Sequence, residues 1–159
     1  MKKDIVLKHL FDKLETEEKL IEQAALASHE AATHEESRSE DRHDTRGLEA
    51  SYLAGAQKAR LAEIHALITF YKFFQPKNFL PTGSIESGAL IELSKNDSKS
   101  LYFLSEKGGA IDLVIDKKPI KVIHTLSPMG EALLGKKIGD DIEFEVNDHI
   151  FEFNISGLW

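Results

Sequence analysis

The segment Gln75-Pro76-Lys77-Asn78-Phe79-Leu80-Pro81 divides the chain into two halves of different composition. Before Pro76 there is no proline and there are two glycines, Gly47 and Gly55, whereas the chain contains 4 prolines and 10 glycines. Because proline and glycine interrupt helices, this distribution predicts a helical first half and a second half built of strands and turns.

Apolar residues of the first half follow the spacing of a coiled-coil seam on both sides of a polar stretch. The seam residues are Leu7, Leu14 and Ile21 on the first side, and Leu53, Ile64, Leu67, Ile68, Tyr71 and Phe74 on the second. The two patterns mirror each other about residue 41, so Ile21 is expected to face Leu61 and Leu14 to face Ile68. We therefore predict an antiparallel coiled-coil hairpin over residues 1–75.

The stretch between the two seams has no apolar residue larger than alanine from Ala27 to Gly47. From His29 to Glu49 the acids outnumber Arg38, Arg42 and Arg46; they are Glu30, Glu35, Glu36, Glu40, Asp41, Asp44 and Glu49. Such a segment buries too little apolar area to offset its ordering entropy. Because the seam is patterned on both sides, we interpret residues 37–49 as the exposed tip of the hairpin rather than as a linker. Asp44 or Thr45 is a predicted N-cap for the returning helix.

The second half alternates apolar and polar residues, as half-buried strands do. Residues 141–146 alternate in this way, and Phe151, Phe153 and Ile155 repeat the pattern after the turn Asn147-Asp148, which predicts a hairpin. Earlier predicted strands are 89–93, 101–104, 111–115 and 121–123. Ser127 as N-cap, Pro128 in the first turn and Gly135 at the end predict one short helix. The predicted fold class is α+β: a helical hairpin at 1–75, a linker at 76–82, and an antiparallel sheet with one short helix at 83–159.

Composition narrows the class of protein. Of 159 residues, 27 are acidic and 20 are basic, and the formal net charge of −7 argues against a general binder of phosphate backbones. The absence of cysteine excludes disulfides, thiol nucleophiles and Cys-ligated zinc. Charges interrupt the apolar residues near the N-terminus, and no run approaches the length of a membrane span, so we expect a cytoplasmic protein without membrane contact.

The segment Ser127-Pro128-Met129-Gly130-Glu131-Ala132-Leu133-Leu134-Gly135-Lys136-Lys137-Ile138-Gly139-Asp140 carries a resemblance. It resembles the C-terminal signature S-P-x-x-x-A-L-L-G-K-x-x-G-D of the bacterial Gre transcript-cleavage factors, the GreA/GreB family. The resemblance implies an FKBP-like fold for the β domain. It further implies a monomer that binds RNA polymerase at the rim of the secondary channel through Ser127, Pro128 and Met129, and that meets nucleic acid only indirectly.

The same resemblance implies that the acidic tip approaches the polymerase active centre. The family carries D-L-S-E-N-A-E-Y there, with two acids three residues apart; here Asp44 and Glu49 are five apart, with Arg46 between them. Asp44 and Glu49 are the first candidates for auxiliary catalytic carboxylates, and Asp41 is the next. They would hold no metal or other cofactor alone, because Mg²⁺ needs near-octahedral coordination; they would share the Mg²⁺ of the polymerase. The chain itself is then not an enzyme.

Other interpretations of the residues stay open. The tip acids can simply solvate an exposed helix end. The protein can be a prolyl isomerase or coiled-coil chaperone that uses the FKBP-like fold directly, or a competitor that occupies the channel without aiding cleavage. The spacings of His29, His34 and His43 do not match the four-residue step of a helical metal site, which disfavours zinc there.

Overall fold

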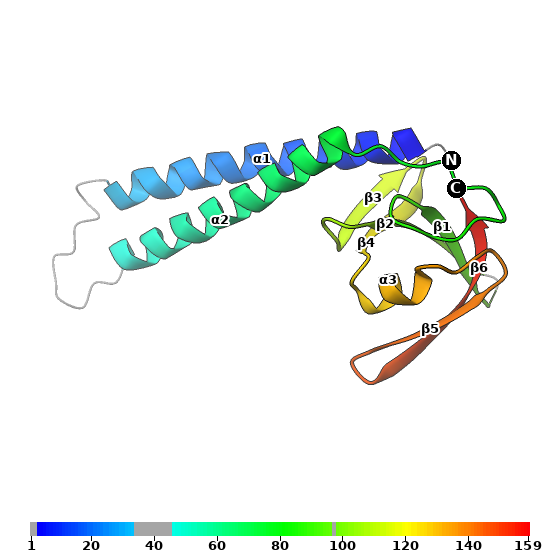
Figure 1. The fold of residues 1–159 in the computed structure, drawn as a ribbon. Coiled ribbons are helices and arrows are strands. Elements are labelled where there is room, and N and C mark those ends of the chain that lie inside the picture. The colour runs from blue at the N-terminus through cyan, green and yellow to red at the C-terminus, as the bar shows by residue number, and fades with distance from the viewer. Residues whose placement is uncertain (1–2, 34–45, 97) are drawn as a thin grey trace. The chain divides into compact units, whose positions relative to one another are not determined.

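A computed structural model describes residues 3–33, 46–96 and 98–159 (Figure 1). Two long helices come first, α1 (Lys3–Thr33) and α2 (Arg46–Phe73), and α3 (Pro128–Leu133) is short. The strands are β1 (Leu90–Lys95), β2 (Ser98–Ser105), β3 (Ile111–Ile115), β4 (Lys118–His124), β5 (Asp141–Val146) and β6 (His149–Leu158). This order confirms the predicted α+β class, with a helical hairpin followed by a sheet and one short helix.

The chain divides into two compact units. One comprises Phe11–Lys72, and the other comprises Met1–Leu10 together with Phe73–Trp159. The start of α1 therefore belongs with the β strands, and its Val6 and Leu10 are fully buried. The predicted boundaries at 1–75, 76–82 and 83–159 stay a prediction.

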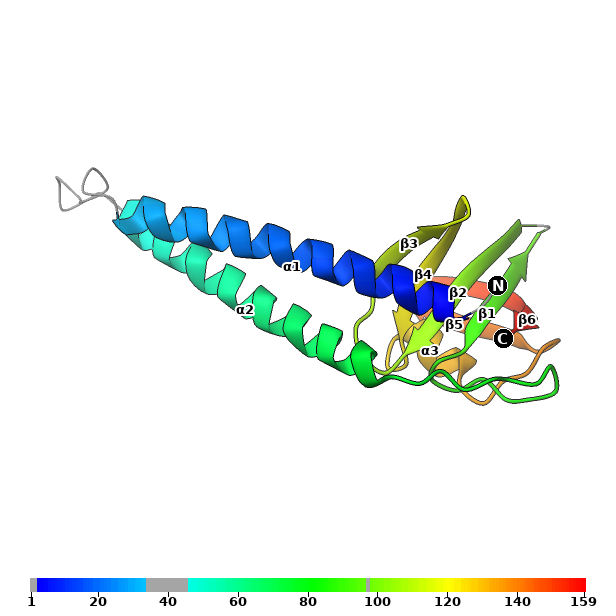
Figure 2. The same ribbon diagram turned by 90° about the horizontal axis from the view of Figure 1, so that it is seen from above.

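The helical unit has one inward stripe on each helix, and α1 and α2 run in opposite directions (Figures 1 and 2). Leu14, Ile64 and Tyr71 are buried on these stripes. Two ion pairs join the helices, from Arg60 Nη2 to Glu17 Oε1 at 2.6 Å and from His65 Nε2 to Glu18 Oε1 at 2.7 Å. Both pairs agree with the predicted register, in which residues near 18 lie opposite residues near 64.

One predicted seam residue is wrong. Leu53 is 53% exposed, whereas Ala54 and Gln57 are half-buried. The inward stripe of α2 steps by three or four residues through positions 54, 57, 61, 64, 68 and 71, and it leaves Leu53 one position outside. Among the described residues, the buried Oε1 of Gln57 has no hydrogen-bond partner, so the stripe includes a polar side chain that interrupts its apolar residues.

The six strands form one sheet in the order β3-β4-β2-β1-β6-β5. All neighbours are antiparallel except β2 and β4, which are parallel. The parallel pair arises because β3 and β4 form a hairpin that places β4 back beside β2. In the predicted hairpin turn, Asn147 and Asp148 have φ of 51° and 62°, the left-handed conformation that a two-residue type I′ turn requires.

A buried cluster on the sheet positions α3. Its residues are Ile85, Ala89, Ile91, Leu93, Leu104, Leu133, Ile142, Ile155 and Leu158. Leu133 of α3 is fully buried in this cluster, and Met129 of the same helix packs against it while half-buried. Phe103 is also fully buried, and its ring meets that of Phe74 edge to face at 6.4 Å between centroids.

Candidate functional site

The start of α3 is fixed by hydrogen bonds from the end of β4. The Ser127 hydroxyl accepts the backbone N–H of Gly130 at 3.1 Å and donates to the carbonyl of His124 at 2.7 Å. The backbone N–H of Leu126 donates to Nδ1 of His124 at 3.0 Å. Because Nδ1 accepts here, the ring proton of a neutral His124 lies on Nε2. Ser127 is therefore the predicted N-cap, and Pro128 occupies the first turn as expected.

Gly130 is the residue that lets α3 approach β4. A Cβ at this position would lie 2.1 Å from the carbonyl oxygen of His124 and 2.9 Å from that of Thr125. No side chain fits at such distances, so the close approach of helix and strand requires glycine. This glycine lies within the segment that resembles the Gre signature.

The loop after α3 is held by backbone hydrogen bonds. Ile85 donates to the carbonyl of Lys136 at 2.7 Å and accepts from Gly135 at 2.9 Å. Further on, Gly139 donates to the carbonyl of Ile155 at 2.8 Å. Gly135 and Gly139 have φ of 77° and 92°, which explains glycine at both places. The segment from Ser127 to Asp140 is thus a rigid corner of the β domain.

This corner exposes apolar side chains. Leu126, directly before Ser127, is 75% exposed, and Leu134 and Ile138 after α3 are 41% and 38% exposed. Of the three residues predicted to bind polymerase, Pro128 is exposed, Ser127 is half-buried with its hydroxyl in the cap, and Met129 is half-buried against the core. Leu126 is a further exposed apolar residue of this corner. An exposed apolar surface beside a rigid helix suits a protein partner.

The predicted tip carboxylates are only partly covered by the described residues. Glu49 lies in the first turn of α2 and is exposed, and an acid there complements the positive end of the helix dipole. Asp41 and Asp44 lie outside the described residues, as does the predicted cap Thr45. One exposed carboxylate offers too few ligands for the octahedral shell of Mg²⁺.

A cleft of about 480 Å³ lies at β1, β5 and β6. Its lining is mostly polar, with Asp141, Glu143, Glu152 and Asn154, and Phe153 supplies its one aromatic ring. A prolyl isomerase needs an open, aromatic-lined cleft, and this cleft does not have that character.

Residues 81–158 match the family model described as the C-terminal domain of the transcription elongation factors GreA/GreB. The match contains the whole corner from Ser127 to Asp140. Residues 81–158 therefore form a GreA/GreB C-terminal domain. The resemblance of the sequence to this family is thereby confirmed.

The comparisons also match a curated relative, the transcription elongation factor GreA of Mycoplasma capricolum subsp. capricolum. It is 32% identical over 91 residues, which cover 55% of this chain and 54% of that protein. The aligned part is thus about half the length of the relative.

Similar solved structures include GreA factor homolog 1 of Thermus thermophilus, with 18% identity, a TM-score of 0.38, and coverage of 94% of both chains. A GreA/GreB transcription elongation factor from Nitrosomonas europaea has 19% identity and a TM-score of 0.36, covering 74% of this chain and 94% of that one. Scores this low support no conclusion about this chain. Within the described residues, no helix combines the length and apolar character needed to cross a membrane.

Proposed function

We propose that this chain is a bacterial transcription factor that binds RNA polymerase and acts on elongation. The observation that carries the proposal is the match of residues 81–158 to the GreA/GreB C-terminal domain, together with the rigid corner inside it. The corner exposes Leu126 and Pro128 beside a helix whose other side is anchored in the core. Such a surface can dock on a protein without rearrangement of the β domain.

The finer form of the proposal assigns the two units different tasks. The corner with Ser127, Pro128 and Met129 holds the rim of the secondary channel, and the tip carboxylates Asp44, Glu49 and Asp41 reach toward the active centre. The chain's residues then position charge, while the metal and the nucleic acid belong to the polymerase. In this form the protein acts as a monomer in the cytoplasm and is an accessory factor rather than an enzyme.

A second candidate is a factor that occupies the channel without stimulating transcript cleavage. It is favoured by one feature, the five-residue separation of Asp44 and Glu49 with Arg46 between them. An arginine beside the carboxylates lowers the negative charge that the tip would bring to a metal ion. Both candidates share the polymerase-binding corner, so the first experiment concerns binding.

Binding is tested with the full-length chain and core RNA polymerase. We expect Leu126→Ser to weaken the affinity about tenfold or more. Truncation of an apolar contact at the centre of an interface commonly costs about 1 to 2 kcal/mol or more of binding free energy. Leu80→Ser is the matched control, since Leu80 is 72% exposed and Leu126 is 75% exposed, and it should bind as wild type does. A wild-type chain that does not bind, or a pair of variants with equal affinities, contradicts the proposal.

A further inference from the structure

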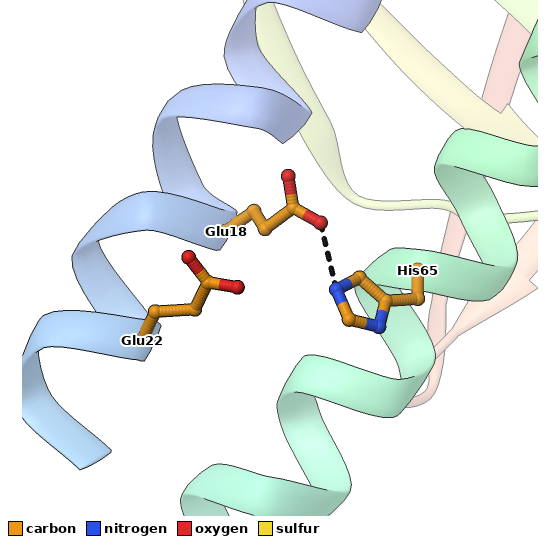
Figure 3. Close-up of side chains that lie close together, drawn as sticks. All are labelled: Glu18, Glu22 and His65. Carbon is orange, nitrogen blue, oxygen red and sulfur yellow. Dashed lines mark ion pairs between the residues drawn. The ribbon is translucent and has the colours of Figure 1, made fainter. Parts of the chain in front are cut away.

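Two helices bring three metal-ligating side chains together in the helical unit. Glu18 and Glu22 lie on α1 and His65 lies on α2, and their ligand atoms all lie within 4.8 Å of one another (Figure 3). His65 Nε2 is 2.7 Å from Oε1 of Glu18. All three belong to the same compact unit, Phe11–Lys72. They lie well before and after residues 37–49 in sequence, so they are a separate set from the tip carboxylates.

The placement follows from helix geometry. Glu18 and Glu22 are four residues apart, so their side chains stack on one face of α1. In Figure 3 both carboxylates reach into the space between the helices, and the ring of His65 enters it from α2. Two like charges at this spacing repel each other, and a cation between them removes that repulsion. His65 forms an ion pair with Glu18 only when protonated, whereas as a neutral ring it offers Nε2 as a ligand.

The donor set selects a class of ion. Ca²⁺ and Mg²⁺ prefer shells made of oxygen, whereas one imidazole nitrogen with two carboxylates suits Zn²⁺ and related divalent transition ions. The side chains of Glu18 and His65 are 24% and 52% exposed, so an ion can enter from solvent and water can complete its coordination. We propose that Glu18, Glu22 and His65 form a binding site for Zn²⁺ or a similar divalent transition ion that joins α1 to α2.

An ion at this site would stabilise the hairpin. The described part of the helical unit has few fully buried side chains, chiefly Leu14 and Ile64, so a cross-link between the helices adds to a small core. An ion that binds the folded hairpin and not the separated helices shifts the equilibrium toward the folded form. The site thus gives the hairpin a stability that depends on metal availability. This inference is independent of the proposed role in transcription.

The test is a titration of the full-length, chelator-treated chain with ZnCl₂, followed by calorimetry and by helical circular dichroism during heating. We expect about one equivalent of Zn²⁺ to bind and the helical melting temperature to rise. Loss of a ligand should weaken binding at least about tenfold in His65→Gln and in Glu22→Gln, since even outer-shell changes cost about 10- to 100-fold. The melting shift should disappear in both variants.

The matched control is His29→Gln, which removes another exposed histidine of the same hairpin and should bind as wild type does. The proposal is overturned if wild type binds no Zn²⁺, or if His65→Gln binds it with wild-type affinity. It is also overturned if MgCl₂ produces the same melting shift as ZnCl₂, because the imidazole would then have no role.

Discussion

At the scale of single residues, Gly130 decides whether α3 can lie against the end of β4. Glycine is required at this position by sterics rather than by backbone conformation, since an added Cβ would lie 2.1 Å from the His124 carbonyl oxygen. The carbonyl belongs to the backbone and cannot rotate away as a flexible side chain would. A methyl group here must displace the helix, the strand end or both.

We therefore predict that Gly130→Ala destabilises the β domain by about 2 kcal/mol or more, in the upper part of the range for overpacked cores. Trp159 is the sole tryptophan and lies in this unit, so denaturant unfolding followed by its fluorescence reports on this domain. Gly55→Ala is the control, because its Cβ meets nothing within 4 Å and it lies in the other unit. An unchanged midpoint for Gly130→Ala would contradict the described contact.

The N-cap of α3 can be predicted from the sequence, whereas the requirement for Gly130 cannot. Ser127 and Pro128 form a local motif, and their roles follow from chain geometry alone. The conflict at Gly130 involves the carbonyl of His124, which only the fold brings close. His65 shows the same limit, since its partner Glu18 is 47 positions away in sequence, and spacing rules along one helix do not detect such a pair.

At the scale of elements, Glu92 connects three strands of the sheet. Its carboxylate accepts from Lys99 Nζ at 2.7 Å and from the Ser156 hydroxyl at 2.8 Å, which links β1 to β2 and to β6. The hydrogen bond from Lys99, followed by that from Ser156, lowers the pKa of Glu92 below 4.5. A lowered pKa in the folded state means that the unfolded chain binds more protons in the acid range, so this contribution to stability is lost as pH falls.

We predict that Glu92→Gln lowers the unfolding free energy of the β domain at pH 7 by up to about 1 kcal/mol, because Lys99 is exposed and its charge is screened. The difference from wild type should be present above pH 4.5, which is the ordinary value, and should fade below it as the carboxyl of wild type becomes protonated. Fluorescence-detected unfolding at several pH values measures this. A difference that persists unchanged at pH 3 would argue against the ionised pair. The control is Glu145→Gln, at an exposed position of β5, which should change neither the unfolding free energy at pH 7 nor its dependence on pH.

Element types were predictable because their patterns are local. The alternation of 141–146 and the turn Asn147-Asp148 predict the β5–β6 hairpin, and the structure has it. The order of strands and the parallel pairing of β2 with β4 depend on contacts between distant segments, which alternation does not encode. Leu53 is exposed because it lies eleven residues before Ile64, whereas the inward positions of α2 keep a seven-residue repeat that places residue 54 on the stripe instead.

At the scale of the whole molecule, the division into units changes how fragments can be used. The β strands form one unit with Met1–Leu10, and Phe74 packs on Phe103. A fragment that begins at residue 76 lacks both parts, and it would expose buried surface on the sheet. Tests of the β domain are therefore best made by substitution in the full-length chain.

The last prediction separates a cleavage factor from a silent occupant of the channel. If the corner near α3 determines affinity and the tip determines the effect, then the two can be changed independently. We expect Asp44→Asn and Glu49→Gln to reduce any effect on transcript cleavage in a stalled elongation complex at least several-fold while polymerase affinity changes little. An exposed charge contributes under about 1 kcal/mol to folding, so the hairpin should remain intact in both variants.

Asp44→Asn is the cleaner of the two variants, because asparagine is also a competent N-cap. Glu15→Gln, on α1 and far from the tip in sequence, is the control and should behave as wild type. If wild type stimulates cleavage and both tip variants match it, the carboxylates only solvate the end of a helix. If wild type does not stimulate cleavage but displaces a cleavage factor from polymerase, the wider separation of Asp44 and Glu49 identifies a competitor. In that case Leu126→Ser should abolish the displacement, since competition depends on binding and not on the carboxylates.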